Sequence, residues 1–223
     1  MKKVTIIMPV YNNKQETDDA INSIVENIHY PNYELIIVES ESTDGTAESV
    51  DAWAGGKIKV FHTKKEGLTK AINFGIKNSD PESDIYLTQN DVIHYKLYKK
   101  DWLTWMVKAS EQFPEAGLIT TLAGGGTDTK GDYLLGLNWV GTWSMYIPRN
   151  TINKVGLFDE EYAPNGDDVD FSYRVCLSGL KILVLPFWVE HHRLTENTND
   201  SSEKCQLGAK RFRQKFKLGE FAE

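Results

Sequence analysis

The feature that most constrains the fold is a regular alternation of apolar runs with helical patterns over the first 90 residues. Four runs of β-prone, largely apolar residues recur along it: 4–10 (VTIIMPV), 34–38 (ELIIV), 57–61 and 84–88. Between them, apolar residues fall at helical spacing, and Asn12 or Asn13 is placed to cap the first helix, which ends before Pro31. Apolar strands that alternate with helices predict an α/β fold, with a mainly parallel sheet covered by helices on both faces.

The second half is less regular but continues the same kind of chain. Its predicted elements are a helix around 102–107 that ends at Pro114, a strand at 117–122, a flexible loop at 123–131, a half-buried strand at 139–147, a helix at 167–178, a strand at 181–185 and a basic helix at 203–216. The sequence contains no internal repeat, linker or low-complexity tract. We therefore expect one domain, 1–223.

Composition excludes several classes of protein. No apolar stretch approaches the roughly 18–20 residues that cross a bilayer, and the apolar run after Met1 is too short for a signal peptide. Cys176 and Cys205 lack the spacing of a zinc site or a disulfide scaffold. A net charge of −7 argues against a nucleic-acid-binding protein. These features predict a soluble cytoplasmic protein.

Polar residues gather where three predicted strands end. Tyr11-Asn12-Asn13 follows the first strand, residues 39–45 (ESESTDG) follow the second, and Gln89-Asn90-Asp91 follows the fourth. In an open parallel sheet, ligands bind outside the carboxyl ends of the strands, so these clusters indicate a binding site rather than turn chemistry alone. Neither GxGxxG after the first strand nor GxxxxGK[ST] occurs, which disfavours a nicotinamide enzyme or a P-loop NTPase.

The same segments carry a resemblance to a known family. VTIIMPVYNN, IIVESESTDGTAE, GLTKAINFGIKNS and YLTQNDV resemble the nucleotide-sugar half of family 2 glycosyltransferases, which have the Rossmann-like GT-A fold. GLFDE followed by DDVDFSYR resembles the acceptor half. The resemblance runs in order from Lys3 to His192 and implies a nucleotide-sugar half at 1–95, an acceptor half at 96–200 and a C-terminal basic helix at 201–223.

The resemblance implies an activity. The chain would be an inverting glycosyltransferase of the hexosyl or deoxyhexosyl type, which moves a sugar from a nucleoside-diphosphate-sugar donor to a hydroxyl of a glycan or lipid-linked acceptor, as in polysaccharide biosynthesis. A UDP-sugar is the first choice of donor. Two alternatives remain: a nucleotidyltransferase, although the basic glycine-rich loop of that class is missing after the first strand, and a non-catalytic nucleotide- or sugar-binding module.

Seven residues would contact the donor nucleotide by this resemblance: Pro9, Val10, Tyr11, Glu39, Asp44, Gln89 and Asn90. Glu39 stands where the family usually has an aspartate that binds the base, often uracil. Glutamate offers the same acceptor chemistry one methylene further out, so the base preference stays open.

The implied cofactor is a divalent cation, Mn²⁺ or Mg²⁺. Asp91 matches the last aspartate of the family's DxD metal motif, while Gln89 replaces its first carboxylate. Such cations bind oxygen ligands and gain most from carboxylates, so we expect loose binding. His191 and His192 follow the last predicted strand, where many family members place a metal-binding histidine, and alternation with Val189 favours His191.

The implied catalytic residues begin a predicted helix. Asp167-Asp168-Val169-Asp170 corresponds to the family's Glu-Asp-x-Asp motif, although a helix N-terminus also favours carboxylates for capping. Asp168 would be the base that removes the acceptor proton, with Asp167 contacting the acceptor or orienting the site. Asp170 and Arg174 lie one turn apart, and we expect them to pair.

A pair of tryptophans and the basic tail helix can each be interpreted in two ways. Trp139 and Trp143 flank Gly141-Thr142 and would either stack on the acceptor sugar or pack in the core. The basic tail helix, with Phe212 and Phe216 one turn apart, would either pack on the domain or contact anionic lipid at a membrane surface. We prefer packing for the tail.

Overall fold

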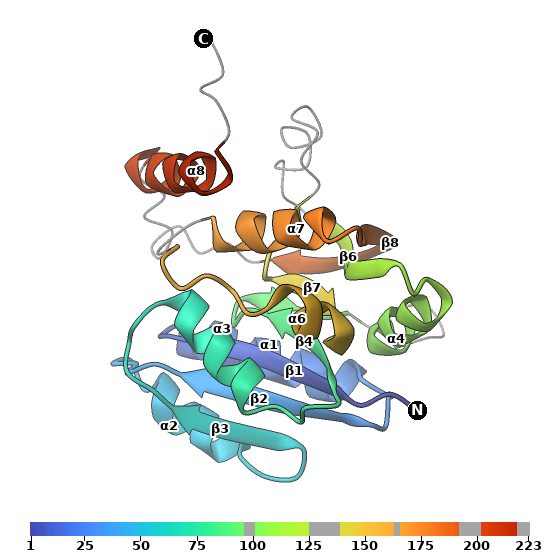
Figure 1. Cartoon of the computed structure of the whole chain (residues 1–223). Helices are drawn as coiled ribbons and strands as arrows, with labels where there is room; N and C mark the ends of the chain where they lie inside the picture. The colour runs from blue at the N-terminus through green and yellow to red at the C-terminus, as the bar shows by residue number, and fades with distance from the viewer. Residues whose placement is uncertain (96–100, 125–138, 163–165, 192–201, 218–223) are drawn as a thin grey trace.

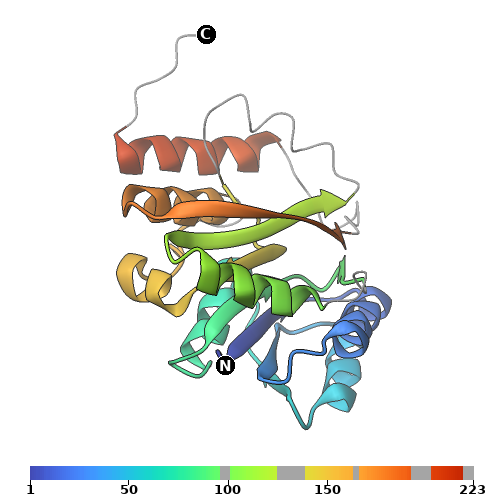
Figure 2. The same cartoon turned by 90° about the vertical axis from the view of Figure 1, so that its right-hand side faces the viewer.

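The described strands form a single eight-stranded sheet. The computed structural model describes residues 1–95, 101–124, 139–162, 166–191 and 202–217, and the strand order is β3-β2-β1-β4-β7-β6-β8-β5 (Figure 1). Helices lie on both faces of this sheet (Figure 2). The α/β prediction is therefore confirmed.

The first half follows the predicted alternation closely. Its elements are β1 (Val4–Val10), α1 (Lys14–Asn27), β2 (Tyr33–Glu39), α2 (Thr46–Trp53), β3 (Ile58–His62), α3 (Leu68–Lys77) and β4 (Asp84–Thr88). β1 pairs in parallel with β2 and β4, and β2 pairs in parallel with β3. All seven residues of β1 and all five of β4 are buried, which explains why both strands are apolar without alternation.

The second half makes the sheet mixed. Its elements are β5 (Val92–Ile93), α4 (Trp102–Gln112), β6 (Ala116–Gly124), β7 (Ser144–Ile147), α6 (Arg149–Val155), α7 (Asp167–Leu177), β8 (Lys181–His191) and α8 (Ser202–Phe216). β7 is antiparallel to both β4 and β6, while β6 and β8 are parallel to each other. β6 and β8 therefore run in the same direction as β4.

Several elements differ from the sequence prediction, among them α6, which was not predicted, and β6, which extends two residues beyond the predicted strand. The strand expected at 139–147 is confined to β7, whose four residues are all buried rather than alternating. β8 does not stop before Pro186 but continues to His191. Its register against β6 shifts between Thr121 and Leu122, and such an irregularity accommodates a proline, which has no N–H to donate. β5, with two residues, is too short to produce a sequence pattern.

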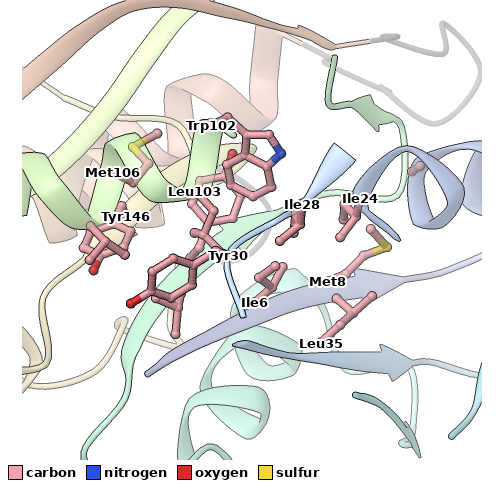
Figure 3. Close-up of a cluster of buried hydrophobic side chains, with 14 of the residues drawn as sticks. Ile6, Met8, Ile24, Ile28, Tyr30, Leu35, Trp102, Leu103, Met106 and Tyr146 are labelled. Carbon is pink, nitrogen blue, oxygen red and sulfur yellow. The ribbon is translucent and has the colours of Figure 1, made fainter. Parts of the chain in front are cut away.

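Two hydrophobic clusters fill the two faces of the sheet. α1, α2 and α4 contribute to one, together with side chains of β1, β2 and β4. Figure 3 shows side chains of this cluster from α1 and α4 beside those of the sheet. α3, α6 and α7 contribute to the other. Each fully buried aliphatic side chain contributes about 1.5–3 kcal/mol, so both clusters hold the strand ends in fixed positions. In the described part of the chain, no helix is long and apolar enough to cross a membrane.

A buried histidine packs against the first of these hydrophobic clusters. His94 is fully buried beside the ring of Trp102, with ring centroids 4.5 Å apart, and its Nε2 lies 3.0 Å from the hydroxyl of Tyr86. The Tyr86 hydroxyl also lies 3.1 Å from that of Ser144. Burial lowers the pKa of His94 to about 3, so the ring is neutral at physiological pH.

The burial of His94 predicts a loss of stability in mild acid. The unfolded chain binds a proton below about pH 6.5 that the folded chain does not, so the free energy of unfolding falls as the pH drops. The expected loss is about 2 kcal/mol at pH 5, from about 1.4 kcal/mol per pH unit. Denaturant unfolding of the wild-type chain and of His94→Gln between pH 7 and 4.5 measures it. Equal pH slopes for the two chains would contradict the prediction.

Candidate active site

The strand directions bring the predicted site residues to one edge of the sheet. β1, β2, β4 and β8 all end at this edge, and β7, which runs the other way, begins there. The predicted residues that follow or precede these ends are Tyr11, Glu39, Gln89, Asn90, Asp91, Trp143 and His191. Residues separated by up to 180 positions in the sequence are thus gathered where open α/β sheets bind ligands.

Asp44 organises the loops after β1 and β2. Its Oδ2 accepts hydrogen bonds from the backbone N–H of Asn13 (2.7 Å) and of Lys14 (3.3 Å), at the start of α1. Its Oδ1 accepts from the backbone N–H of Thr46 (3.1 Å). Neither Asn12 nor Asn13 caps α1 as predicted, because Asn13 takes a left-handed conformation with φ of 66° and makes no side-chain cap. Asp44 supplies this stabilisation, and its predicted contact with a nucleotide stays a prediction.

Glu39 is almost fully buried, and both of its carboxylate oxygens are hydrogen bonded. Oε1 accepts from the backbone N–H of Ser42 (2.6 Å), and Oε2 lies 2.9 Å from Nδ1 of His62. Burial alone would raise the pKa of Glu39, but these hydrogen bonds outweigh it and hold the pKa below its ordinary value. Glu39 is therefore a carboxylate at neutral pH, with lone pairs left on each oxygen.

His62 connects Glu39 to the surface. Its Nε2 lies 2.9 Å from Oδ1 of the exposed Asp51, so each ring nitrogen faces a carboxylate. Hydrogen bonds to Glu39 and Asp51 raise the pKa of His62, because only the doubly protonated ring donates to both. His62 was not among the site residues predicted from the sequence. Its signal was its position at the end of β3, beside the end of β2.

The other residues predicted to bind the donor differ in burial and in their hydrogen bonds. Pro9 and Val10 are buried, and the Tyr11 ring is half-buried with the Lys65 ammonium 3.5 Å from its centroid. The Asn90 amide donates to the Asn12 carbonyl (3.0 Å) and the Thr17 hydroxyl (2.9 Å). The Gln89 amide donates to the hydroxyl of Thr142 (3.1 Å), just before β7. Asn90 and Gln89 thus join the end of β4 to its neighbours.

Asp91 and His191 form the candidate metal centre. His191 Nε2 lies 3.4 Å from Asp91 Oδ1, and this oxygen is buried without a hydrogen bond. A buried carboxylate oxygen without a donor suits a cation, and an imidazole nitrogen beside it is a second suitable ligand. Within the described ranges, no three His, Cys, Asp or Glu residues gather as a metal site, so these two would be part of a shell. His192 lies outside the described residues.

Trp143 packs against the candidate metal centre. Its ring stacks on His191 with centroids 5.7 Å apart and an interplanar angle of 20°. Gly141 lies under the same indole, and a Cβ at Gly141 would come within 2.1 Å of Trp143 Nε1, so the indole position requires a glycine there. Trp139 is half-buried. Trp143 therefore contacts a predicted site residue, His191.

Asp167 and Asp168 open α7 at the same edge. Asp167 is buried, and its Oδ2 accepts from the hydroxyl of Thr69 (3.1 Å) in the first turn of α3. Burial raises the pKa of Asp167. Asp168 is half-buried, and its Oδ1 accepts from the backbone N–H of Val169 (2.8 Å). Because α3 begins just beyond the end of β3, the Thr69 contact locates this carboxylate pair at the edge occupied by Glu39.

Asp170 and Arg174 pair as predicted. The Arg174 Nε donates to Asp170 Oδ2 at 2.7 Å, and the guanidinium also donates to the carbonyls of Val155 and Leu157, both at 2.9 Å. Arg174 thus fastens α7 to the end of α6. This pair supports the site structurally.

Asn73 connects the two halves of the chain through hydrogen bonds to Phe158. It was not among the residues predicted from the sequence. Its amide donates to the Phe158 carbonyl (2.9 Å), and its carbonyl oxygen accepts from the Phe158 N–H (3.1 Å). The side chain is 2% exposed. An asparagine between apolar residues of an amphipathic helix was the available signal, because a buried amide needs such partners.

Comparison with known proteins identifies the family. The sequence profile of glycosyl transferase family 2 matches residues 5–158, more than half of the chain. The chain belongs to this family. An uncharacterized glycosyltransferase of Rickettsia felis is 37% identical over 196 residues, covering 77% of this chain and 31% of that protein. The chain therefore spans about a third of that relative's length.

Solved structures of other glycosyltransferases share the fold. A mannosyltransferase from Pyrobaculum calidifontis, solved with GDP-Man and Mn²⁺, superposes with a TM-score of 0.76 at 19% identity, covering 99% of this chain and 66% of that one. GalNAc-T7, solved with UDP, GalNAc and Mn²⁺, gives 0.77 at 15% identity, covering 96% of this chain and 48% of that one. The likeness confirms the predicted GT-A fold.

Proposed function

We propose that this member of family 2 is an inverting glycosyltransferase that moves a sugar from a nucleoside-diphosphate-sugar to a hydroxyl acceptor. The observation that carries the proposal is the pairing of Asp91 with His191, at the sheet edge where α7 also presents Asp167 and Asp168. One group suits a diphosphate-bound cation and the other suits proton removal, and glycosyl transfer with a diphosphate leaving group uses both.

The nucleotide would lie over the ends of β1 and β2. Glu39, held ionised by Ser42 and His62, would accept a hydrogen bond from an N–H of the base. The half-buried ring of Tyr11 would line the pocket beside it. Similar folds have been solved with GDP-Man and with UDP, which supports a nucleotide here without choosing the base; a UDP-sugar remains our first choice.

Asp91 and His191 would hold a divalent cation, Mn²⁺ or Mg²⁺, whose charge stabilises the diphosphate leaving group when bound. Gln89 supplies no charge where the family's DxD motif has its first carboxylate, so the protein would offer the cation one carboxylate, from Asp91, and one imidazole, from His191. We therefore propose that affinity for the cation is modest without donor, whose phosphate oxygens complete the shell.

The acceptor would enter between Trp143 and the start of α7. Asp168 would take the proton of the acceptor hydroxyl as its oxygen attacks the anomeric carbon, while the bond to the diphosphate breaks and the configuration inverts. Asp167, fixed by Thr69, would orient the acceptor. Trp143, and Trp139 four residues before it, would offer an apolar surface to a sugar ring, whether of a glycan or of a lipid-linked acceptor.

A donor panel tests the proposal. Calorimetric titration of the chain with UDP- and GDP-sugars, in Mn²⁺ and in EDTA, should give measurable binding to at least one donor, tighter in Mn²⁺. Product analysis with that donor should then show release of the nucleoside diphosphate. Failure to bind any nucleotide sugar would refute the proposal. Binding with no release of nucleoside diphosphate, even with candidate acceptors, would favour a non-catalytic binding module.

A further inference from the structure

The C-terminal helix packs on α7 through aromatic side chains. Phe212 is buried, and its ring lies 5.1 Å from that of Tyr173 on α7, while Phe216 lies 4.5 Å from the same ring. Both views show α8 lying along the outer side of α7 (Figures 1 and 2). These contacts agree with the packing that we preferred for the tail helix and place α8 beside the helix that carries Asp167 and Asp168.

Two cations of α8 reach inward between these helices. Lys215 Nζ lies 2.6 Å from Oδ1 of Asp170, which is fully buried, and 2.7 Å from Oδ2 of Asp159. Arg211 lies 3.2 Å from Oδ2 of Asp159 and 2.5 Å from a carboxylate oxygen of Glu161. Partial burial would raise the pKa of Asp159, but hydrogen bonds led by that from Lys215 lower it to about 2.

α8 also approaches the segment that leads into α7. Gly166, the residue before Asp167, has φ of 102°, and a Cβ there would lie 3.2 Å from the Tyr162 ring and 3.6 Å from Gly208 of α8. The Arg211 guanidinium lies 5.0 Å from the Tyr162 ring centroid. The backbone turn that orients Asp167 is therefore enclosed between Tyr162 and α8.

The charges around this turn explain why cations are needed. Three carboxylates, Asp167, Asp168 and Asp170, lie within the first turn of α7. The charged or titratable groups around them are Arg174 of α7 itself, three residues that precede α7 and two that α8 supplies: Asp159, Glu161, Tyr162, Arg211 and Lys215. Asp170 repels a charge on Asp167, and Arg174 occupies only one of the Asp170 oxygens. Lys215 provides the second cation at Asp170.

We propose that Lys215, together with Arg211, is a positioning residue for the Asp167–Asp168 pair, so that these two side chains of α8 support the catalytic residues without touching substrate. The inference rests on the proposed function, because it assigns α8 a part in proton removal. Lys215 would stabilise the ionised form of the carboxylates, and the Arg211 contacts would keep the segment 159–162 and the start of α7 in place.

The chain supplies a matched control on the same helix. Lys210 is exposed and has no ion pair among the described residues, whereas Lys215 contacts Asp159 and Asp170. Lys215→Met and Lys210→Met remove the same charge and keep an unbranched stem of similar length. Lys215→Arg retains the charge and should restore function in part. Arg211→Met is a second test of the same interface should Lys215→Met not fold.

The experiment combines turnover with a direct titration. In Lys215→Met, turnover with the donor found by calorimetry should fall at least about tenfold with donor affinity and donor KM unchanged, since the donor residues lie in the other half. NMR of ¹³C-labelled aspartates, assigned with Asp167→Asn, should show the Asp167 carboxyl titrating at least about 0.5 pH unit higher. Lys210→Met should match the wild-type chain, and Arg211→Met should lower turnover in the same way.

Turnover and the Asp167 titration in these variants decide whether Lys215 positions the carboxylate pair. Wild-type turnover and an unshifted Asp167 titration in folded Lys215→Met would overturn the inference. Equal losses in Lys210→Met would also overturn it, because the effect would then not depend on the interface. If the wild-type chain binds no nucleotide sugar, the proposed function fails, and the titration of Asp167 still decides whether Lys215 controls its ionisation.

Discussion

Replacing Asp168 with asparagine is expected to lower sugar transfer by about 10²–10⁴-fold, while the affinity for the donor stays roughly equal to that of the wild-type chain. The amide keeps the size of the side chain and its ability to accept the Val169 N–H, but it cannot take a proton. The loss should therefore appear in kcat rather than in KM for the donor. Turnover with the identified donor and acceptor, and calorimetry with the donor alone, measure the two quantities.

Asp19→Asn is the matched control for this variant. Asp19 is an exposed aspartate on α1, where its carboxylate accepts a hydrogen bond from Gln15 (3.1 Å), and it lies outside the site. The Asp19→Asn variant should transfer sugar at the wild-type rate. Full activity of Asp168→Asn would show that Asp168 is not the base, and loss of donor binding in that variant would show a structural role instead.

Replacing Asp91 with asparagine is expected to weaken donor binding in Mn²⁺ by about 100-fold or more. Substitution of residues that merely support metal ligands costs about 10–100-fold in metal affinity, and Asp91 would be a ligand itself. In EDTA the variant and the wild-type chain should bind the donor equally, because no cation then contributes. Calorimetry under both conditions separates the metal-dependent part, and Mn²⁺ titration in the presence of nucleoside diphosphate measures the ion directly.

A His191→Asn variant provides a second test of the same metal centre. His191→Asn should weaken binding in Mn²⁺ in the same sense as Asp91→Asn, because the two side chains lie together. Asp19→Asn again serves as the control. An Asp91→Asn variant that keeps the full gain from Mn²⁺ would remove Asp91 from the metal centre and leave its buried oxygen without an explanation.

Most of the first half of the fold could be predicted from the sequence. β1 and β4 are bounded as their apolar runs indicate, and α1, α2 and α3 form between the strands, where the apolar residues fall at helical spacing. These elements depend on contacts between neighbours in the chain, which the local pattern records. β8 was predicted too short because Pro186 normally ends a regular strand, and only its irregular pairing with β6 explains the continuation.

Several residues of the candidate site could be predicted from the sequence, but their contacts with one another could not. The sequence singled out Asp91 and His191 through resemblance, and the structure brings them to 3.4 Å. The partners of Glu39 could not be predicted, because His62 comes from the neighbouring strand and its ring position depends on sheet register. The same holds for Asp44, which stabilises the start of a helix 30 residues earlier in the chain.

The alternation of apolar runs and helices, by itself, determined that this chain forms an α/β sheet with polar loops at one edge, because strand and helix periodicities arise from near neighbours. Only the tertiary structure decided that β7 runs antiparallel to β4 and β6, that Asp91 meets His191, and that Lys215 reaches Asp170. Such contacts join residues that are 45 to 100 positions apart, as Asp170 and Lys215 or Asp91 and His191 are. They form only when the whole chain packs, so no local pattern encodes them.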